Sequence, residues 1–146
     1  MQISQLDPTQ ADRFGSTHTL HYALSDGRQI VLLSGVVNVE MQSPGWMNEN
    51  AGTNLFEDDL TLELALPADL LREAQSFRII EAVPYLSLNA ITGLSNVGWA
   101  VNEFQVAKQE AGVSAVQLDA RVAVSRSGEI LRSVAYHITL VGEVIG

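Results

Sequence analysis

Three consecutive carboxylates, Glu57, Asp58 and Asp59, form the densest group of side chains in the sequence that could do chemistry. Such a cluster can ligate Ca²⁺ or Mg²⁺ together with loop carbonyls, and a bound metal could activate water in a hydrolase. The preceding residues 48–52 (NENAG) lack the spaced aspartates and the distal glutamate of an EF-hand. We therefore expect a solvated acidic loop end before a strand, with no bound metal and no cofactor. A metal-dependent hydrolase ranks third among the functions considered.

The three histidines make a weak case for zinc. His18 and His21 are three residues apart on an expected strand, so their side chains point to opposite faces of it. His137 lies far along the chain, and no H-x-H or H-E-x-x-H spacing is present. Partly exposed strand histidines are the expected outcome.

No motif assigns a catalytic residue. The sequence contains no G-x-S-x-G elbow, no P-loop and no G-x-G-x-x-G, and Ser95 in residues 93–98 (GLSNVG) lacks elbow spacing. Glu81 and Glu103 could act as an acid–base pair only if their strands were neighbours. The absence of cysteine excludes disulfides, thiolate zinc sites and cysteine nucleophiles.

The overall charge excludes further classes of partner. The chain has 146 residues, which indicates a single domain over 1–146, and a net charge of −9 with only eight Lys and Arg. Binding to nucleic-acid phosphates or to an anionic membrane would require a basic face. Residues 1–14 lack the pattern of a signal peptide, and no apolar run approaches the ~18 residues that span a bilayer. These features favour a cytoplasmic protein, or a component of a particle assembled in the cytoplasm.

The first half of the chain is strand-like. Residues 17–24 and 29–42 flank the turn sequence SDGR, and Asp-Gly between two apolar runs is a strong hairpin signal. In residues 59–66, four leucines alternate with Asp59, Thr61, Glu63 and Ala65, as in a strand with one wet side. Residues 67–75 (PADLLREAQ) are the one helix candidate, because Pro67 suits a helix start and an apolar stripe follows.

The second half predicts more strands. Residues 77–83, 85–91 and 97–107 are expected to be strands, with Pro84 marking an end, an edge or a bulge and a second bulge near Asn102–Glu103. Residues 113–124 and 129–145 flank the sequence SRSG and are expected to form a second hairpin. Its alternation predicts Leu118, Val122 and Ile138 as core, and residues 129–145 are apolar on both faces for part of their length. The predicted fold is all-β: an antiparallel β-sandwich or flattened barrel of about eight strands with one short α-helix over 67–75.

The stretch 43–59 (SPGWMNENAGTNLFEDD) has no secondary-structure period. Trp46 and Met47 sit among turn formers, so they either plug the loop locally or anchor a docking arm on a partner. No Lys or Arg occurs between Arg28 and Arg72, although the acids are dense there. We predict a docking arm whose acids orient it towards arginines of a neighbouring copy.

The leading function predicted from the sequence is a non-enzymatic structural or interaction β-module that assembles with itself or with other protein subunits, such as those of a larger particle. The predicted partner-binding residues are Trp46, Met47, Glu49, Phe56, Glu57, Asp58, Arg121, Arg126 and Arg132. The alternative is a small apolar-ligand binder whose interior is lined by Trp99, Phe104 and Tyr136.

Overall fold

The computed structural model describes residues 1–42, 48–50, 55–92, 99–124 and 130–146. The described chain is nearly all strand, with one short 3-10 turn, η1. The elements in chain order are β1 (Gln2–Ser4), η1 (Ala11–Arg13), β2 (Phe14–Ala23), β3 (Gln29–Gln42), β4 (Asn48–Asn50), β5 (Leu55–Ala65), β6 (Ser76–Thr92), β7 (Trp99–Val106), β8 (Ala115–Val124) and β9 (Ile130–Ile145). None of the described segments is a helix long and apolar enough to cross a membrane.

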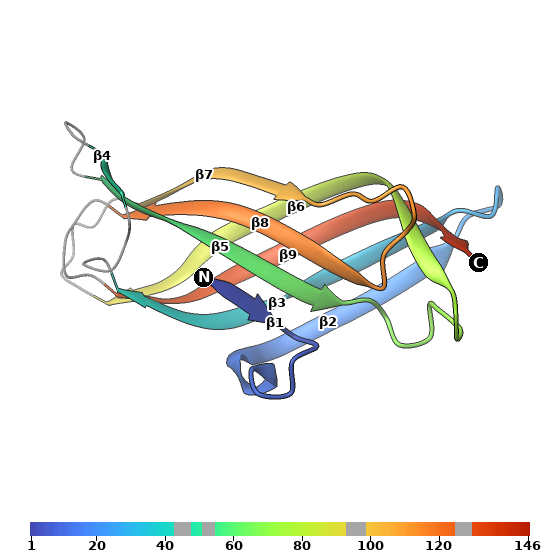
Figure 1. Ribbon diagram of the computed structural model, residues 1–146, viewed down its shortest axis with the longest axis horizontal. Coiled ribbons are helices and arrows are strands. Elements are labelled where there is room, and N and C mark those ends of the chain that lie inside the picture. The colour runs from blue at the N-terminus through green and yellow to red at the C-terminus, as the bar shows by residue number, and fades with distance from the viewer. Residues whose placement is uncertain (43–47, 51–54, 93–98, 125–129) are drawn as a thin grey trace.

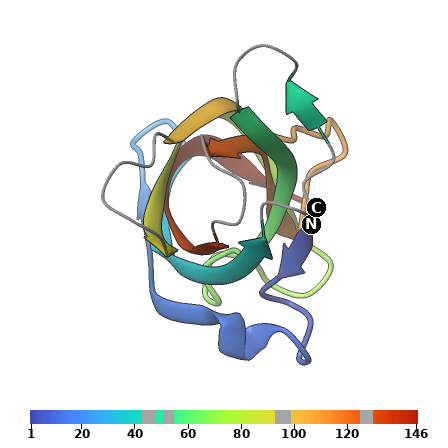
Figure 2. The same ribbon diagram turned by 90° about the vertical axis from the view of Figure 1, so that its left-hand side faces the viewer.

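Two sheets form a sandwich-like body. Sheet A has the strand order β1-β5-β8-β7, with β4 also paired to β5, and sheet B has the order β2-β3-β9-β6. The long strands run obliquely along the molecule and wrap around a common interior (Figures 1 and 2). All neighbouring strands are antiparallel except β1 and β5, which are parallel. The predicted all-β sandwich of about eight strands is confirmed.

The N-terminal hairpin forms as predicted. β2 and β3 pair antiparallel from Ala23 opposite Gln29 back towards Phe14, and the turn between them contains Gly27 with φ +87°. Only glycine adopts that left-handed conformation without steric cost, which explains the Asp-Gly signal. The bulge predicted near Asn102 is also present, as a register shift between Val101 and Glu103.

The predicted C-terminal hairpin is wrong. β8 pairs with β5 and β7 in sheet A, whereas β9 pairs with β3 and β6 in sheet B. The chain therefore passes from one sheet to the other between them. Alternation of apolar residues shows which side of a strand is buried but not which strand lies beside it, and both strands bury one face in the same interior.

The helix predicted over 67–75 is also wrong. This segment consists of turns at residues 68–70 and 73–74, and Ala74 has a φ of +63°. The Arg72 N–H donates to Gln75 Oε1, and the Gln75 N–H donates to the Arg72 carbonyl, which closes a local loop. A helix this short is marginal without tertiary support. Burial of Leu66 and Leu70 holds the segment against the body as a loop instead.

The interior is filled by the alternating apolar residues of both sheets. Leu118 and Val122 on β8 and Ile138 on β9 are completely buried, as predicted. Leu62 lies directly opposite Leu118 and is equally buried. Tyr136 is the one tyrosine of this core, and its hydroxyl lies over Gly35, where an added Cβ would approach within 2.7 Å of it.

Candidate functional site

The outer face of sheet B is a surface of apolar side chains, because its strands carry them at outward-facing as well as inward-facing positions. Strand pairing aligns these positions into rows that cross β2, β3, β9 and β6. The rows are Tyr22–Ile30–Val141–Glu81, Leu20–Leu32–Thr139–Val83 and His18–Ser34–His137–Tyr85. We call the set Leu20, Tyr22, Ile30, Leu32, Val83, Tyr85 and Val141 the apolar face.

Several members of the apolar face are strongly exposed. Val83 retains 67% of its surface, Tyr85 60%, Tyr22 52% and Leu20 48%. The central members on β3 and β9 are half-buried by their neighbours on the sheet. Single exposed apolar residues are common on protein surfaces, whereas a contiguous set across four strands is not.

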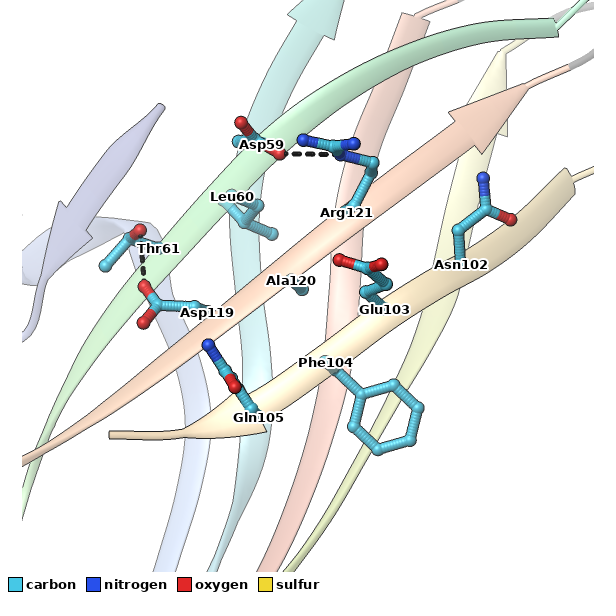
Figure 3. A pocket seen from close by; sticks show the side chains of 10 residues that line it. All are labelled: Asp59, Leu60, Thr61, Asn102, Glu103, Phe104, Gln105, Asp119, Ala120 and Arg121. Atoms are coloured by element: carbon cyan, nitrogen blue, oxygen red, sulfur yellow. Dashed lines mark hydrogen bonds and ion pairs between the residues drawn. The ribbon is translucent and has the colours of Figure 1, made fainter. Parts of the chain in front are cut away.

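The outer face of sheet A is polar and carries a shallow groove of about 780 Å³. The polar side chains of its wall project from β5, β8 and β7 on one side of the sheet (Figure 3), whereas the side chains of Leu60 and Ala120 are buried on the other side. The lining residues are Asp59, Leu60, Thr61, Asn102, Glu103, Phe104, Gln105, Asp119, Ala120 and Arg121. This groove combines carboxylates, amides and one guanidinium, and it has no metal-ligand geometry.

Most charges in the groove are already paired. Arg121 Nε donates to Asp59 Oδ1 at 3.0 Å, and that hydrogen bond, with the attraction of the carboxylate, raises the pKa of Arg121. Thr61 Oγ1 donates to Asp119 Oδ1 at 2.8 Å, and Gln117 Nε2 donates to the same carboxylate. These contacts fix the side chains against one another, so the groove is a solvated polar surface.

The three consecutive carboxylates lie within β5, so the loop end predicted for them is wrong, and their side chains separate in space. Glu57 accepts from the Asn102 side chain, Asp58 Oδ1 accepts from the backbone N–H of Asp59 at 2.8 Å, and Asp59 pairs with Arg121. Within the described residues, no group of three His, Asp or Glu side chains is arranged to hold a metal ion. Alternation on β5 separates Asp58 from its neighbours, because Leu60 and Leu62, which share its parity, face the interior.

The histidines lie on sheet B. His18 and His137 stand in one outward-facing row, and His21 points to the other side of β2, where its Nε2 lies 3.2 Å from Asp69 Oδ1. The hydrogen bond from His21 lowers the pKa of Asp69. This contact links β2 to the loop that follows β5.

The structure places the predicted partner-binding residues in different surroundings. Trp46, Met47 and Arg126 lie outside the described residues, and Glu49 and Phe56 are described only as members of β4 and β5. Of the arginines, Arg121 is paired within its own chain and Arg132 is exposed on β9. The docking role of these residues remains a prediction.

The predicted ligand-lining residues do not share one environment. Phe104 is 40% exposed on β7, the edge of sheet A, whereas Tyr136 is buried on β9 in sheet B. Figure 3 shows the Phe104 ring beyond β7, away from the other groove side chains. The side chain of Trp99 lies outside the description.

Sequence reasoning missed the apolar face. Its signal was present, since Leu20 and Tyr22 alternate with polar Thr19 and His21, and Val83 and Tyr85 alternate across Pro84. These signals could be combined only with knowledge of how the four strands pair, and β2 and β6 are far apart in the chain.

Comparison of the chain with protein-family models, with curated proteins and with solved structures finds no match.

Proposed function

We propose that this protein is a non-enzymatic interaction module that assembles with copies of itself or with other protein subunits, and that the apolar face of sheet B is its assembly surface. The observation that carries this proposal is the alignment of apolar side chains across all four strands of the sheet, exposed on β2 and β6 and half-buried on β3 and β9. This is the leading function expected from the sequence, but the proposed contact surface is the outer face of sheet B and not the arm over residues 43–59.

The size of the apolar face supports this role. Four strands about 4.8 Å apart and three rows of side chains give a surface of roughly 20 by 20 Å, or about 400 Å². The apolar face holds seven of its twelve positions, or about 230 Å². A specific interface buries about 800 Å² on each partner, usually as an apolar centre within a polar rim. The apolar face therefore fits the centre of such an interface. Its surrounding rim is polar, with His18, His137 and Glu81 in the same rows.

The energetics favour covering this surface. Tyr22 and Tyr85 are large aromatic side chains with a polar tip, a type enriched at interface centres. Burying apolar area contributes about 25 cal/mol per Å² before the costs of association are subtracted. Covering the face with an equal patch from another subunit therefore stabilises the assembly far more than any of the surface ion pairs of sheet A.

The test exchanges one exposed side chain for a charge. Val83→Arg places a guanidinium in the apolar face, and Gln105→Arg, at an exposed position on the outer face of sheet A, is the matched control. We expect wild type and Gln105→Arg to sediment as assemblies larger than the 15.8 kDa chain, and Val83→Arg to shift towards the monomer. Equal assembly of both variants would show that this face is not the contact. A wild-type chain that stays monomeric at high concentration would contradict self-assembly.

A further inference from the structure

β2 is an edge strand with little buried surface. Seven of its ten residues are exposed, and Phe14 at its start is half-buried against the core. β3 is the one strand with which it makes an extensive contact in the described part of the molecule. Its inward-facing residues Thr19 and Ala23 are exposed as well, so β2 extends past the cover that sheet A provides.

The hydrogen-bonding groups on its free side can be identified. The Leu24 N–H donates to the Arg28 carbonyl at 2.8 Å, so this pair is bonded across the hairpin. In an antiparallel ladder bonded and non-bonded pairs alternate, so Tyr22, Leu20 and His18 bond to β3. The backbone N–H and C=O groups of Thr17, Thr19, His21 and Ala23 therefore point away from β3. Within the described residues, no other strand pairs with them.

The other sheet edges are covered or interrupted, and on β7 the register shifts between Val101 and Glu103. On β1, the Gln10 side-chain amide accepts from the Ser4 N–H at 2.8 Å. β6 contains Pro84 and several register shifts, and Lys108 from the chain after β7 donates to the Ile80 carbonyl at 3.1 Å.

From Thr17 to Ala23, β2 has none of these protections, because its one register shift lies earlier, between Phe14 and Thr17. The stretch 17–23 (THTLHYA) contains no proline, lysine, arginine or carboxylate and has regular register throughout. Proteins usually guard exposed edges with such residues and bulges, because an unguarded edge pairs with another strand.

We propose that β2 pairs antiparallel with β2 of a second copy, so that the two B sheets join into one continuous sheet about a twofold axis. This inference rests on the proposed function and names the partner as a second copy of this chain. An identical strand is a suitable partner because a twofold axis makes any antiparallel self-pairing complementary. It also brings no like charges together, since 17–23 carries no ionised acid or base apart from its histidines.

The geometry selects a register. The outer faces of the two copies must stay continuous, and all four residues with free backbone groups should be used. Both conditions are met when Thr19 pairs with His21 and Thr17 pairs with Ala23 of the other copy. Leu20 then faces its own copy across the axis, and Tyr22 faces His18. The apolar faces of the two copies join at β2, which doubles the apolar surface on one side of the dimer to about 460 Å². Strand pairing thereby enlarges the surface that the proposed function uses.

Cysteine cross-linking tests the register directly, because the chain contains no cysteine of its own. The Leu20 pair would be non-hydrogen-bonded, with Cα atoms about 4.5 Å apart, which is within the range of a disulfide. We expect Leu20→Cys to form a disulfide-linked dimer under mild oxidation. It should do so at least about tenfold faster than Gln117→Cys, an exposed control on sheet A, because pairing raises the effective thiol concentration towards millimolar. Equal rates for the two variants would overturn the inference.

A backbone variant tests the hydrogen bonds. Thr19→Pro removes an N–H on the free edge and leaves the ladder to β3 intact, since proline is tolerated at such edge positions. Introduced together with Leu20→Cys, it should reduce cross-linking to the control rate, whereas Thr19→Val should not. Circular dichroism verifies that each variant is folded. Cross-linking that is unaffected by the proline would contradict strand pairing, and if the proline variant unfolds, Leu20→Cys against Gln117→Cys decides alone.

The outcome also separates this inference from the proposed function. Val83 lies on β6, at the opposite edge of sheet B from β2. Leu20→Cys that still cross-links after Val83→Arg supports the edge contact whatever the role of the apolar face. Conversely, loss of assembly in Val83→Arg with no Leu20→Cys cross-linking would keep the apolar face and reject the β2 pair.

Discussion

The two sheets are alike inside and unlike outside. Both present alternating leucine, isoleucine and valine to the shared core. On the outer side, sheet A carries acids and amides that pair with one another, whereas sheet B carries Leu20, Tyr22, Val83 and Tyr85 with no cover. The inner faces must match because they fill one interior, but the outer faces are free to differ. The information about interaction therefore lies in the outward-facing half of each strand.

This difference explains why the charge of the chain is not a guide to the assembly surface that we propose. Glu57, Asp59, Glu63, Glu103 and Asp119 stand on the strands of sheet A. Their concentration there keeps one face well hydrated and leaves the other free of repulsion. An acidic protein can thus present a neutral, apolar surface to a partner.

The largest expected effect tests whether the two faces of sheet A are as different as alternation indicates. Leu118→Ala removes a fully buried side chain of β8 and should lower the free energy of unfolding by roughly 2–5 kcal/mol. Gln117→Ala, one residue earlier on the exposed side, should change it by less than about 0.5 kcal/mol. Urea titration measures both, and similar costs for the two variants would contradict the register of β8.

The next test compares the inner and outer tyrosines of sheet B at high pH. Burial raises the pKa of Tyr136 to about 12. The unfolded chain loses this proton near pH 10. The stabilisation from the buried, neutral hydroxyl is therefore complete below about pH 10, and the free energy of unfolding falls by up to about 2–3 kcal/mol as the pH rises to about 12. Tyr136→Phe should not show this fall in the free energy of unfolding at high pH, whereas Tyr85→Phe on the outer face should show it like the wild type. Urea midpoints at pH 9 and pH 11.5 provide the measurement; the same loss in all three proteins would mean that Tyr136 is hydrated.

A third test concerns the close contact between Gly142 on β9 and the backbone of Arg78 on β6. A Cβ on Gly142 would collide with the carbonyl oxygen of Arg78 and lie 2.7 Å from the Phe77 ring. Backbone cannot yield cheaply, so Gly142→Ala should destabilise the fold by about 1–3 kcal/mol. Gly15→Ala is the control on the exposed strand of the same sheet, where the nearest atom is 3.5 Å away. Thermal unfolding of the two variants should therefore differ clearly, and equal midpoints would argue against the tight packing of β9 on β6.

The smallest effect comes from exchanging equivalent atoms between the two outer faces. Val83→Thr replaces an exposed methyl on sheet B with a hydroxyl, and Thr61→Val does the reverse on sheet A, where it also removes the hydrogen bond to Asp119. We expect a change below about 0.5 kcal/mol for Val83→Thr and a loss of about 1 kcal/mol for Thr61→Val. Retention on a hydrophobic-interaction column should fall for Val83→Thr and rise for Thr61→Val. Shifts in the same direction would undermine the distinction between the faces.

The sequence predicted the parts of the fold that depend on local pattern. Two-residue alternation and turn chemistry predicted most of the strands, the β2–β3 hairpin around Gly27 and the buried positions Leu118, Val122 and Ile138. β1 and β4 were not predicted, and β6 was predicted as two strands on either side of Pro84. The bulge between Val101 and Glu103 was predicted from a change of parity. Each of these features is determined by a few residues close together in the chain.

Features that depend on which strands become neighbours were not predicted. The pairing of β9 with β3 and β6 could not be inferred from residues 129–145, because their alternation suits any partner that buries the same face. The apolar face was missed for the same reason, since it exists only when β2 and β6 are brought into one sheet. The helix expected over 67–75 failed because the buried Leu66 and Leu70 anchor the segment as a loop.

The crossing from β8 in sheet A to β9 in sheet B also constrains the order of folding. β3 and β6 are not hydrogen-bonded to each other, and β9 joins them along most of their length. During synthesis β9 emerges after both, so sheet B stays open, with apolar side chains exposed, until the ribosome has delivered residues 130–145. Contacts of such long sequence separation slow folding and prolong the exposure of unpaired strands. The nascent chain therefore passes through a state with unpaired strand edges, and a chain truncated before β9 should not form sheet B.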